Sequence, residues 1–299
     1  MRWVVALVLC LAPTIARSHA DVAGRAREAA VAPASASTST LQPAEEWTCW
    51  FDGAPLQNLP LPTPKAVART ARAGQVLAVE SVELTPFGTE WVRVKSQSTA
   101  GRLWVPLAYV RRVSLDNPTS GDLPIGQERV GPYDGLPIHY QPSDLAPIPA
   151  RYCYNDVPQR LRAEARQACR EMLDAAKDEA GLHIKVLSSY RSAQTQAYLC
   201  RQKIKSEGIG QQDVARPGHS EHQLGTTVDL VADNGLHLLN DGFGSTPEGR
   251  WLQRNCHRFA FIQSYTKKRE RRDGSPYEPW HYRYVGRANV KRFTESKDE

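Results

Sequence analysis

The stretch from Arg216 to Asp229 reads R-P-G-H-S-E-H-Q-L-G-T-T-V-D and holds the densest run of chemically capable side chains in the sequence. A second block, from Glu278 to Gly286, reads E-P-W-H-Y-R-Y-V-G. A catalytic zinc needs three protein ligands of the His or carboxylate type and one open position. The two blocks supply six candidates, and residue chemistry alone leaves open which three of them bind: His219, Glu221, His222, Asp229, Glu278 and His281.

Glu278 is also a candidate for a role outside the ligand set, because a free carboxylate is needed to take a proton from water at such a centre. It lies three residues before His281, and residues three apart in a regular strand point to opposite faces. We therefore expect a bend at Pro279 that turns both side chains toward one site. The helical H-E-x-x-H arrangement of other zinc peptidases does not occur in this sequence.

The surrounding sequence has the pattern of an α+β domain between residues 151 and 292. Apolar residues recur every three or four positions from Gln159 to Ala180, which predicts a helix. Asn155 or Asp156 is the expected N-terminal cap, and Gly181 stands where the helix should stop. The other predicted elements are a strand at Ile184–Leu187 and helices at Ser192–Lys205 and Pro247–Arg258.

The segment from 47 to 114 has a different pattern, made of short strands separated by turn residues. Glu90–Lys95 alternates polar and apolar residues with period two, as a half-buried strand does. Further strands are predicted at Val76–Val79, Leu103–Pro106 and Tyr109–Val110. Several short strands in so short a segment favour a small all-β barrel. Residues 115–150 are rich in Pro, Gly and Asp and are predicted to be a connector.

The first 20 residues have the pattern of a secretory signal peptide. Arg2 precedes an apolar run from Trp3 to Leu11, and Ser18-His19-Ala20 fits the small-x-small cleavage pattern. Residues 21–46 have almost no large apolar side chains and are predicted to be a disordered linker. We therefore expect an exported protein, periplasmic or extracellular, with no integral membrane segment once the signal is removed.

Net charge gives a weaker indication of the partner. The formal charge is +6, and removal of the signal peptide with its two arginines leaves +4. A mildly cationic surface suits an anionic wall polymer, although it serves solubility equally well, and nucleic acid is not expected as a partner of an exported protein. The basic run Lys267–Arg272 is predicted to be a solvated loop, with contact to anionic wall polymer as the alternative.

Five cysteines remain after the signal peptide, and an exported compartment is oxidising. The simplest expectation is two disulfides and one free thiol, with the pairing undetermined by sequence. These cysteines are Cys49, Cys153, Cys169, Cys200 and Cys256.

The motifs resemble those of a known family. Ser220-x-His222-x-x-Gly225-x-Thr227-x-Asp229 resembles the S-x-H-x-x-G-x-A-x-D motif of VanY-type D-alanyl-D-alanine carboxypeptidases. The block from Glu278 to Gly286 is similar to their E-P-W-H-x-R-Y-V-G, and Ser189–Ser192 is similar to their G-Y-R-S. The resemblance covers roughly residues 120–290. It implies a zinc peptidase domain of the hedgehog/D-Ala-D-Ala metallopeptidase type, in which helices flank a small antiparallel sheet.

The resemblance also implies roles for single residues. It implies that zinc is bound by His222, Asp229 and His281, with Glu278 as the general base. It further implies that Arg191 stabilises the oxyanion of the reacting carbonyl and that Tyr190, Gln196 and Ser220 contact the substrate. His219 is the rival ligand, but only His222 has the motif's spacing to Gly225 and Asp229. Thr227 stands where the family has Ala, which leaves the substrate preference open.

The function implied is that of a secreted, monomeric, zinc-dependent D,D-carboxypeptidase acting on peptidoglycan stem peptides. The alternatives are an L,D-carboxypeptidase, a peptidoglycan endopeptidase, and a wall-binding protein without catalysis, as the hedgehog-type proteins show to be feasible. The segment 47–114 resembles bacterial SH3-like domains through Trp91-Val92-Arg93-Val94 and Gly101-Arg102-Leu103-Trp104-Val105. That resemblance implies wall-peptide binding or a spacer.

Overall fold

The computed structural model describes residues 46–61, 66–85, 88–95, 102–113, 122–273 and 275–295. The predicted signal peptide, and the predicted linker except for Glu46, lie outside the described residues. None of the helices in the described ranges combines the length and the apolar character needed to cross a bilayer.

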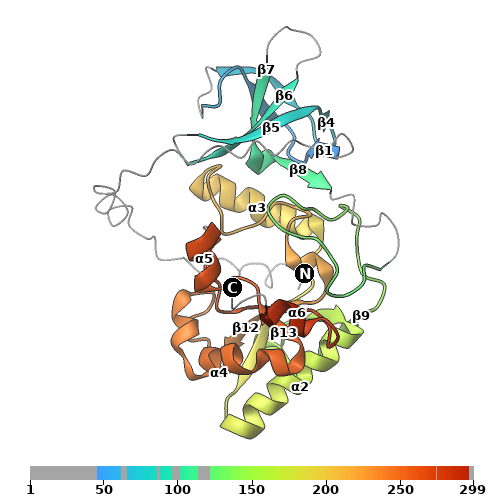
Figure 1. The fold of residues 1–299 in the computed structure, drawn as a ribbon, viewed down its shortest axis with the longest axis vertical. Coiled ribbons are helices and arrows are strands. Elements are labelled where there is room, and N and C mark those ends of the chain that lie inside the picture. Colours follow the sequence, from blue (N-terminus) through green and yellow to red (C-terminus); the bar gives the residue numbers. More distant parts are fainter. Residues whose placement is uncertain are drawn as a thin grey trace, which may run out of the picture. The chain divides into compact units, whose positions relative to one another are not determined.

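The N-terminal part of the described chain is built from two antiparallel sheets, at the top of Figure 1. The three-stranded sheet has the order β4 (Val76–Leu77), β1 (Glu46–Cys49), β8 (Val110–Val113). The five-stranded sheet has the order β3 (Val67–Ala71), β2 (Ala54–Gln57), β7 (Arg102–Pro106), β6 (Glu90–Lys95), β5 (Val79–Leu84). The predicted strands at Glu90–Lys95 and Leu103–Pro106 form, whereas Val76–Val79 is divided between β4 and β5, and Tyr109 lies in a 3-10 turn before β8. The strand pairing among the described residues does not close a barrel, so the SH3-like barrel is not confirmed.

The C-terminal part is built around a four-stranded antiparallel sheet with the order β11, β12, β14, β13. These strands are β11 (Ile184–Ser188), β12 (Thr227–Ala232), β14 (His281–Tyr284) and β13 (Phe261–Gln263). Side chains alternate between the two faces of a strand. Val228, Leu230 and Tyr282 accordingly join the apolar core, and Asp229 and His281 lie on the opposite face. The same alternation that builds the core therefore collects the polar side chains on one face.

Two helices cover the apolar face of this sheet. These are α2 (Ala163–Ala180) and α4 (Pro247–Asn255), which contribute Met172, Leu173, Trp251 and Leu252 to the same buried cluster (Figure 1). The predicted end of α2 is confirmed, because Gly181 adopts the left-handed conformation with a φ of 66°.

The predicted start of α2 is wrong, because Arg160–Arg162 form strand β10 and pair with β9 (Leu145–Pro147). Asn155 and Asp156 lie in a separate short 3-10 turn, where both have positive φ, and cap nothing. Because Arg160–Arg162 are paired as a strand, they do not form the first turn of the helix that the apolar pattern predicts.

The other helices follow the sequence pattern with one exception. Helix α3 (Ala193–Glu207) begins after Ser192, whose side chain accepts a hydrogen bond from the Thr195 amide. The run predicted as a loop forms helix α5 (Lys267–Asp273), because Lys, Arg and Glu are strong helix formers. Shorter helical segments are α6 (Val290–Glu295) and 3-10 turns at Leu107–Tyr109, Ala150–Tyr152, Tyr154–Asp156, Glu221–Leu224, Asp241–Ser245 and Cys256–Phe259.

The segment from residue 122 to 150 contributes its own apolar contacts. Leu123, Leu136 and Tyr140 form a small buried cluster with Leu224, which lies between the metal-ligand candidates of the first block. This segment therefore packs against the part of the chain that carries the candidate site.

The prediction of two disulfides is wrong for the structure, in which no disulfide joins the five cysteines of the described residues and all five are buried. Cys49 belongs to the core of the N-terminal sheets and Cys200 to a cluster on α3, whereas the other three lie in the core beneath the C-terminal sheet. Burial raises the pKa of Cys169 to about 12. The thiols therefore act as small apolar side chains in three separate clusters.

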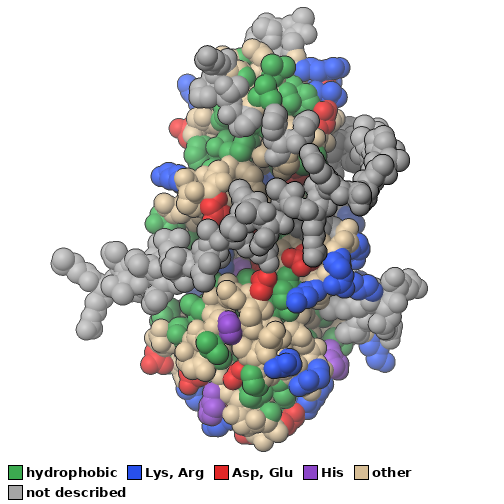
Figure 2. All heavy atoms as spheres, turned by 90° about the vertical axis from the view of Figure 1, so that its left-hand side faces the viewer, with side chains coloured by type: hydrophobic (Ala, Val, Ile, Leu, Met, Phe, Trp, Pro, Cys, Tyr) green, Lys and Arg blue, Asp and Glu red, His purple; other side chains and the backbone are tan. Residues whose placement is uncertain are grey.

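On the face drawn in Figure 2, basic and acidic side chains are interspersed rather than separated by sign. Over the part of that face formed by described residues, this mixture gives no broad field of one sign.

Gly225 allows a test of how tightly the first block is packed. It has a φ of 70°, and a β-carbon there would lie 2.9 Å from Leu145 Cδ2 and 3.1 Å from Pro142 Cγ. Gly181 has nearly the same backbone conformation but nothing within 4 Å of the added carbon. We expect Gly181→Ala to lower the free energy of unfolding by about 1 kcal/mol and Gly225→Ala by at least about 2 kcal/mol. Urea denaturation measures both, and equal losses would contradict tight packing at Gly225.

Candidate active site

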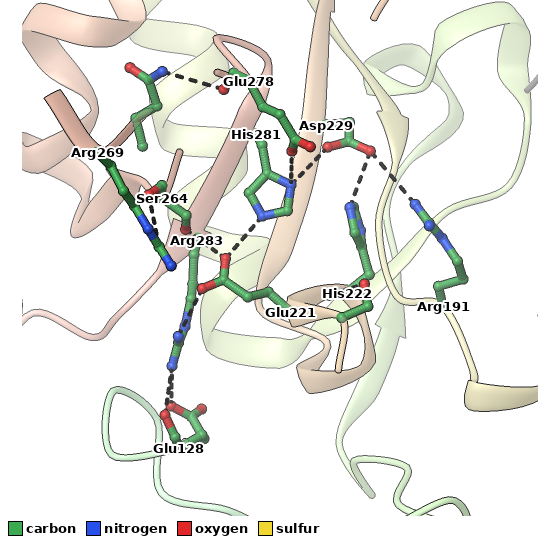
Figure 3. A network of polar contacts seen from close by, with 12 residues as sticks. Glu128, Arg191, Glu221, His222, Asp229, Ser264, Arg269, Glu278, His281 and Arg283 are labelled. Carbon is green, nitrogen blue, oxygen red and sulfur yellow. Dashed lines mark hydrogen bonds and ion pairs between the residues drawn. The ribbon is translucent and has the colours of Figure 1, made fainter. Parts of the chain in front are cut away.

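Three side chains from three elements converge on one point above the polar face of the sheet (Figure 3). His222 lies on the 3-10 turn after Ser220, Asp229 on β12 and His281 on β14. Asp229 and His281 are paired directly across the two antiparallel strands, which places their side chains on the same face. The His222 Nε2 atom lies 3.1 Å from Asp229 Oδ2, and the His281 Nδ1 atom lies 3.3 Å from Asp229 Oδ1.

This donor set fits a metal ion. One potential ligand atom from each residue lies within 4.8 Å of the others, and all three residues are buried. The remaining nitrogen of each imidazole already has a partner: His222 Nδ1 lies 2.8 Å from the Ser189 carbonyl oxygen, and His281 Nε2 lies 2.9 Å from Glu221 Oε2. The buried Asp229 Oδ1 atom has no hydrogen bond among the described residues. Two imidazoles with fixed outer partners and one unsatisfied carboxylate oxygen are the arrangement that a mononuclear metal site requires.

The pKa values of the three residues show how strongly they interact. Burial lowers the pKa of His222 below its ordinary value. Burial also acts to lower the pKa of His281, but Asp229 and Glu221, the carboxylates that face its two ring nitrogens, outweigh it and raise this pKa to about 10. Burial acts to raise the pKa of Asp229, but the two imidazoles hold it well below its usual range. Asp229 is therefore held as an anion, which favours a cation beside it.

Glu278 lies beside these three side chains. Its Oε2 atom is 3.4 Å from His281 Nδ1. The chain turns at Pro279 and Trp280, where the His281 amide donates to the Glu278 carbonyl oxygen at 3.3 Å, so the expected bend is confirmed. Burial raises the pKa of Glu278 to about 7. A carboxylate with this pKa can take and return a proton near neutral pH.

Arg191 is the cationic side chain at the same site. Its Nη2 atom lies 3.8 Å from Asp229 Oδ2 and donates to Ser188 Oγ at 3.1 Å. Its Nη1 atom donates to Gln196 Oε1 at 2.9 Å. The guanidinium is thus fixed in direction while remaining partly exposed, with 19% of the side chain accessible.

The three predicted substrate contacts have different places in the structure. Gln196 is 2% exposed, and its amide also donates to the Ala215 carbonyl oxygen at 2.7 Å, so the structure makes it a support for Arg191. Ser220 is buried and accepts from the His222 amide, which fixes the turn that carries this ligand. Tyr190 is half-buried, with its hydroxyl 3.4 Å from Gln141 Oε1.

His219, the rival ligand, lies outside the cluster. Its Nδ1 atom is 2.8 Å from the Gly131 carbonyl oxygen, and its Nε2 atom accepts from the Arg112 amide at 3.3 Å. Both ring nitrogens are committed to backbone groups, so His219 is a structural residue. Neighbouring Arg216 has a similar part, because its buried guanidinium donates to the Val110 and Pro132 carbonyl oxygens.

Sequence reasoning did not predict the network of buried charges behind His281. Glu221 was a candidate ligand, but it contacts His281, Ser264 and Arg283 and does not face the cluster of ligand atoms (Figure 3). Arg283 contacts Glu128 in turn. The sequence offered one signal: Glu221 and Arg283 lie within the two motif blocks, and the packing of apolar side chains does not explain a charged residue at either position.

Comparisons with known proteins agree with this geometry. Residues 158–287 match the family model described as "VanY: D-alanyl-D-alanine carboxypeptidase". The chain is 38% identical over 160 residues to "Putative carboxypeptidase YodJ" of Bacillus subtilis (strain 168), covering 52% of this chain and 58% of that protein. It is 35% identical over 158 residues to a D-alanyl-D-alanine carboxypeptidase of Enterococcus faecalis (strain ATCC 700802 / V583), covering 47% and 55%. The matches therefore span little more than half the length of these relatives.

One solved structure, that of the LD-carboxypeptidase LdcB, aligns with a TM-score of 0.52 and 35% identity over 56% of this chain and 80% of that chain. The fold is similar to that of a carboxypeptidase, and the site adds a triad of side chains suited to one metal ion. Through residues 158–287 the chain contains a domain that matches the VanY D-alanyl-D-alanine carboxypeptidase family.

The raised pKa of His281 leads to a prediction about metal binding. The ring is protonated below about pH 10, so binding through Nδ1 must release one proton, whereas His222 is already neutral near pH 8 and releases none. Affinity for a divalent metal ion should rise with pH, by about tenfold per unit between about pH 8 and pH 9. Calorimetric titration in buffers with different ionisation enthalpies measures the proton release. His183→Gln, at an exposed histidine, is the matched control, and a pH-independent affinity would contradict the assignment.

Proposed function

We propose that this chain is an exported, zinc-dependent D,D-carboxypeptidase that removes the terminal D-Ala from the stem peptides of peptidoglycan. The observation that carries the proposal is the convergence of His222, Asp229 and His281 beside the free carboxylate of Glu278. Two imidazoles and one carboxylate are a donor set that suits zinc. The family relationship and the Enterococcus faecalis relative support the substrate class.

Zinc bound by these ligands would supply a Lewis acid that makes water acidic at neutral pH and polarises a carbonyl group. Glu278 then performs the proton transfers. It accepts a proton from the attacking water molecule and returns it to the leaving amine. Burial favours the return of the proton, because it raises the pKa of the Glu278 carboxyl group, to about 7 in the metal-free protein.

Arg191 stabilises the negative charge that develops on the carbonyl oxygen during attack. Gln196 and Ser188 hold the guanidinium from two sides, so little reorganisation is needed when this charge appears. The same cation would draw the terminal carboxylate of the substrate toward the site. These two uses of Arg191 are compatible with one short peptide lying across the ligands.

The second candidate is an L,D-carboxypeptidase, and one specific observation favours it. The aligned structure with a TM-score above one half is described as an LD-carboxypeptidase, and its identity to this chain is 35%. The metal ligands and Glu278 serve cleavage of either bond equally. The choice between them depends on side chains that contact the residue before the scissile bond.

The remaining parts of the chain have proposed roles consistent with this activity. The signal peptide at residues 1–20 would direct the enzyme across the membrane, where the wall peptides are found. The segment 47–114 would bind wall peptide or act as a spacer. A wall-binding protein without catalysis is disfavoured, because the ligand set is accompanied by both Glu278 and Arg191.

A substitution at Glu278 tests the proposed base. Glu278→Gln preserves the size of the side chain but removes the group that accepts the proton. We expect zinc content to stay at one ion per chain and the turnover number on a peptide ending in D-Ala-D-Ala to fall about a thousandfold. Glu207→Gln, at an exposed glutamate of α3, should retain full activity. A turnover number of Glu278→Gln close to that of the unaltered protein would contradict the assignment of Glu278 as the base.

The bond that is cut can be read from product masses. Mature protein is incubated with muropeptides carrying tripeptide, tetrapeptide and pentapeptide stems, with and without a chelator. Loss of one D-Ala from the pentapeptide alone supports the D,D-activity, and loss from the tetrapeptide supports the L,D-activity. Cleavage of cross-linked dimers would indicate an endopeptidase instead. Cleavage that persists with the chelator, or no cleavage of any stem, would contradict a zinc peptidase.

A further inference from the structure

The orientation of the His281 ring determines which of its nitrogens can bind metal. Nδ1 faces Asp229 Oδ1 at 3.3 Å, and Nε2 faces Glu221 Oε2 at 2.9 Å (Figure 3). A neutral imidazole can use Nδ1 as a ligand only when its proton is on Nε2. The carboxylate of Glu221 is the acceptor that holds the proton there. The ligand therefore depends on a partner that lies behind it.

Glu221 is fixed by contacts to both of its oxygens. Ser264 Oγ donates to Oε2 at 2.6 Å, and Arg283 Nη1 donates to Oε1 at 3.1 Å. Glu221 is only 6% exposed, so water has little access to replace either contact. Rotation of the carboxylate would leave a buried charged group without its partners, which is costly.

Arg283 is held from its far side by Glu128. Its Nη2 atom donates to Glu128 Oε2 at 2.9 Å, and the Gly126 amide donates to the same oxygen at 2.7 Å. Arg283 follows His281 by two residues on β14, so both side chains lie on the same face of the strand. One strand thus carries the ligand and also the cation that fixes the ligand's partner.

The contacts that support His281 extend beyond the part of the chain that matches the family model. Glu128 lies 30 residues before residue 158, where that match begins. It is 8% exposed and sits in the segment whose apolar side chains pack against Leu224. The segment before the matched domain therefore contributes a buried charge to the support of a metal ligand.

The two histidines are supported in different ways. His222 Nδ1 faces a backbone carbonyl, that of Ser189, whereas His281 Nε2 faces a carboxylate. A carboxylate partner makes the opposite ring nitrogen a stronger ligand than a neutral carbonyl does. Substitution of one side chain, Glu221, can therefore remove the support of His281. The support of His222 is a backbone carbonyl group, which a side-chain substitution does not remove.

We propose that Glu221 is the positioning residue for His281, braced by Ser264 and by the Arg283–Glu128 pair, and that it sets the affinity and geometry of the metal site. The proposal rests on the proposed function in one respect only, the use of His222, Asp229 and His281 as metal ligands. Its test reads metal binding directly and needs no substrate.

Glu221→Gln is the decisive variant, because the amide keeps the shape of the side chain but cannot accept from both His281 and Arg283. We expect affinity for Zn²⁺, measured by competition with a chromophoric chelator, to fall about 10- to 100-fold. The visible absorption spectrum of the Co²⁺-loaded variant should change in position or intensity. Peptidase activity, where present, should recover when excess Zn²⁺ is added.

Glu164→Gln is the matched control. Glu164 accepts a hydrogen bond from the hydroxyl of Tyr284, which lies on the opposite face of the same strand. This variant should keep the metal affinity and the Co²⁺ spectrum of the unaltered protein. Equal losses in both variants would show a general disturbance of β14 and would overturn the positioning role.

Glu128→Gln and Ser264→Ala test the support without altering Glu221 itself. Each should weaken metal binding, but less than Glu221→Gln does, and these two variants decide the matter if Glu221→Gln fails to fold. Unchanged affinity and an unchanged Co²⁺ spectrum in all folded variants would overturn the proposal while leaving the proposed function intact. Unaltered protein that binds neither Zn²⁺ nor Co²⁺ would overturn both.

Discussion

The site depends on one pairing, that of Asp229 opposite His281 in the antiparallel strands β12 and β14. A shift of one residue in this register would turn His281 toward the apolar core and Tyr282 toward the ligands. The core prevents such a shift, because Val228 and Tyr282 are paired beside them and are fully buried on the other face. The packing that stabilises the domain therefore also fixes the distance between two of the three ligands.

The third ligand is brought in by a tight turn rather than by a strand. Ser220 caps the turn that carries His222, and Gly225 ends it in the left-handed conformation, with no room for a β-carbon between Leu145 and Pro142. The spacing from His222 to Asp229 is thus set by a turn that only glycine completes without strain. This requirement gives the sequence motif its recognisable form.

Local features explain which elements could be predicted from sequence. The end of α2 at Gly181 and the bend at Pro279 each depend on one or two adjacent residues, and both are confirmed. The start of α2 could not be predicted from neighbouring residues, because it depends on the pairing of Arg160–Arg162 with Leu145–Pro147, an earlier segment that the helical pattern does not include. The disulfide prediction followed from the expected compartment, whereas the structure distributes the five thiols over three clusters.

That His222, Asp229, His281 and Glu278 lie in one candidate site could be predicted, because they sit in dense motifs with a family resemblance. The support behind them could not, because it joins residues that are far apart. Arg283 and Glu128 are separated by 155 positions, and neither lies in a pattern that predicts contact with the other. His219 is the opposite case. Its place in the motif suggested a metal ligand, but its ring nitrogens form hydrogen bonds with the backbone of Gly131 and Arg112.

The balance of charge explains why these residues need a cation. With neutral imidazoles, four carboxylates face two guanidiniums, which leaves a net charge of −2: Glu128, Glu221, Asp229 and Glu278 against Arg191 and Arg283. Without metal, protons take the place of the cation, because the pKa of His281 rises to about 10 and burial raises that of Glu278 to about 7. A divalent ion held by His222, Asp229 and His281 would take the place of the His281 proton, and its charge would favour the ionised form of Glu278. Occupation of the site by metal would therefore leave Glu278 as the free base that hydrolysis requires.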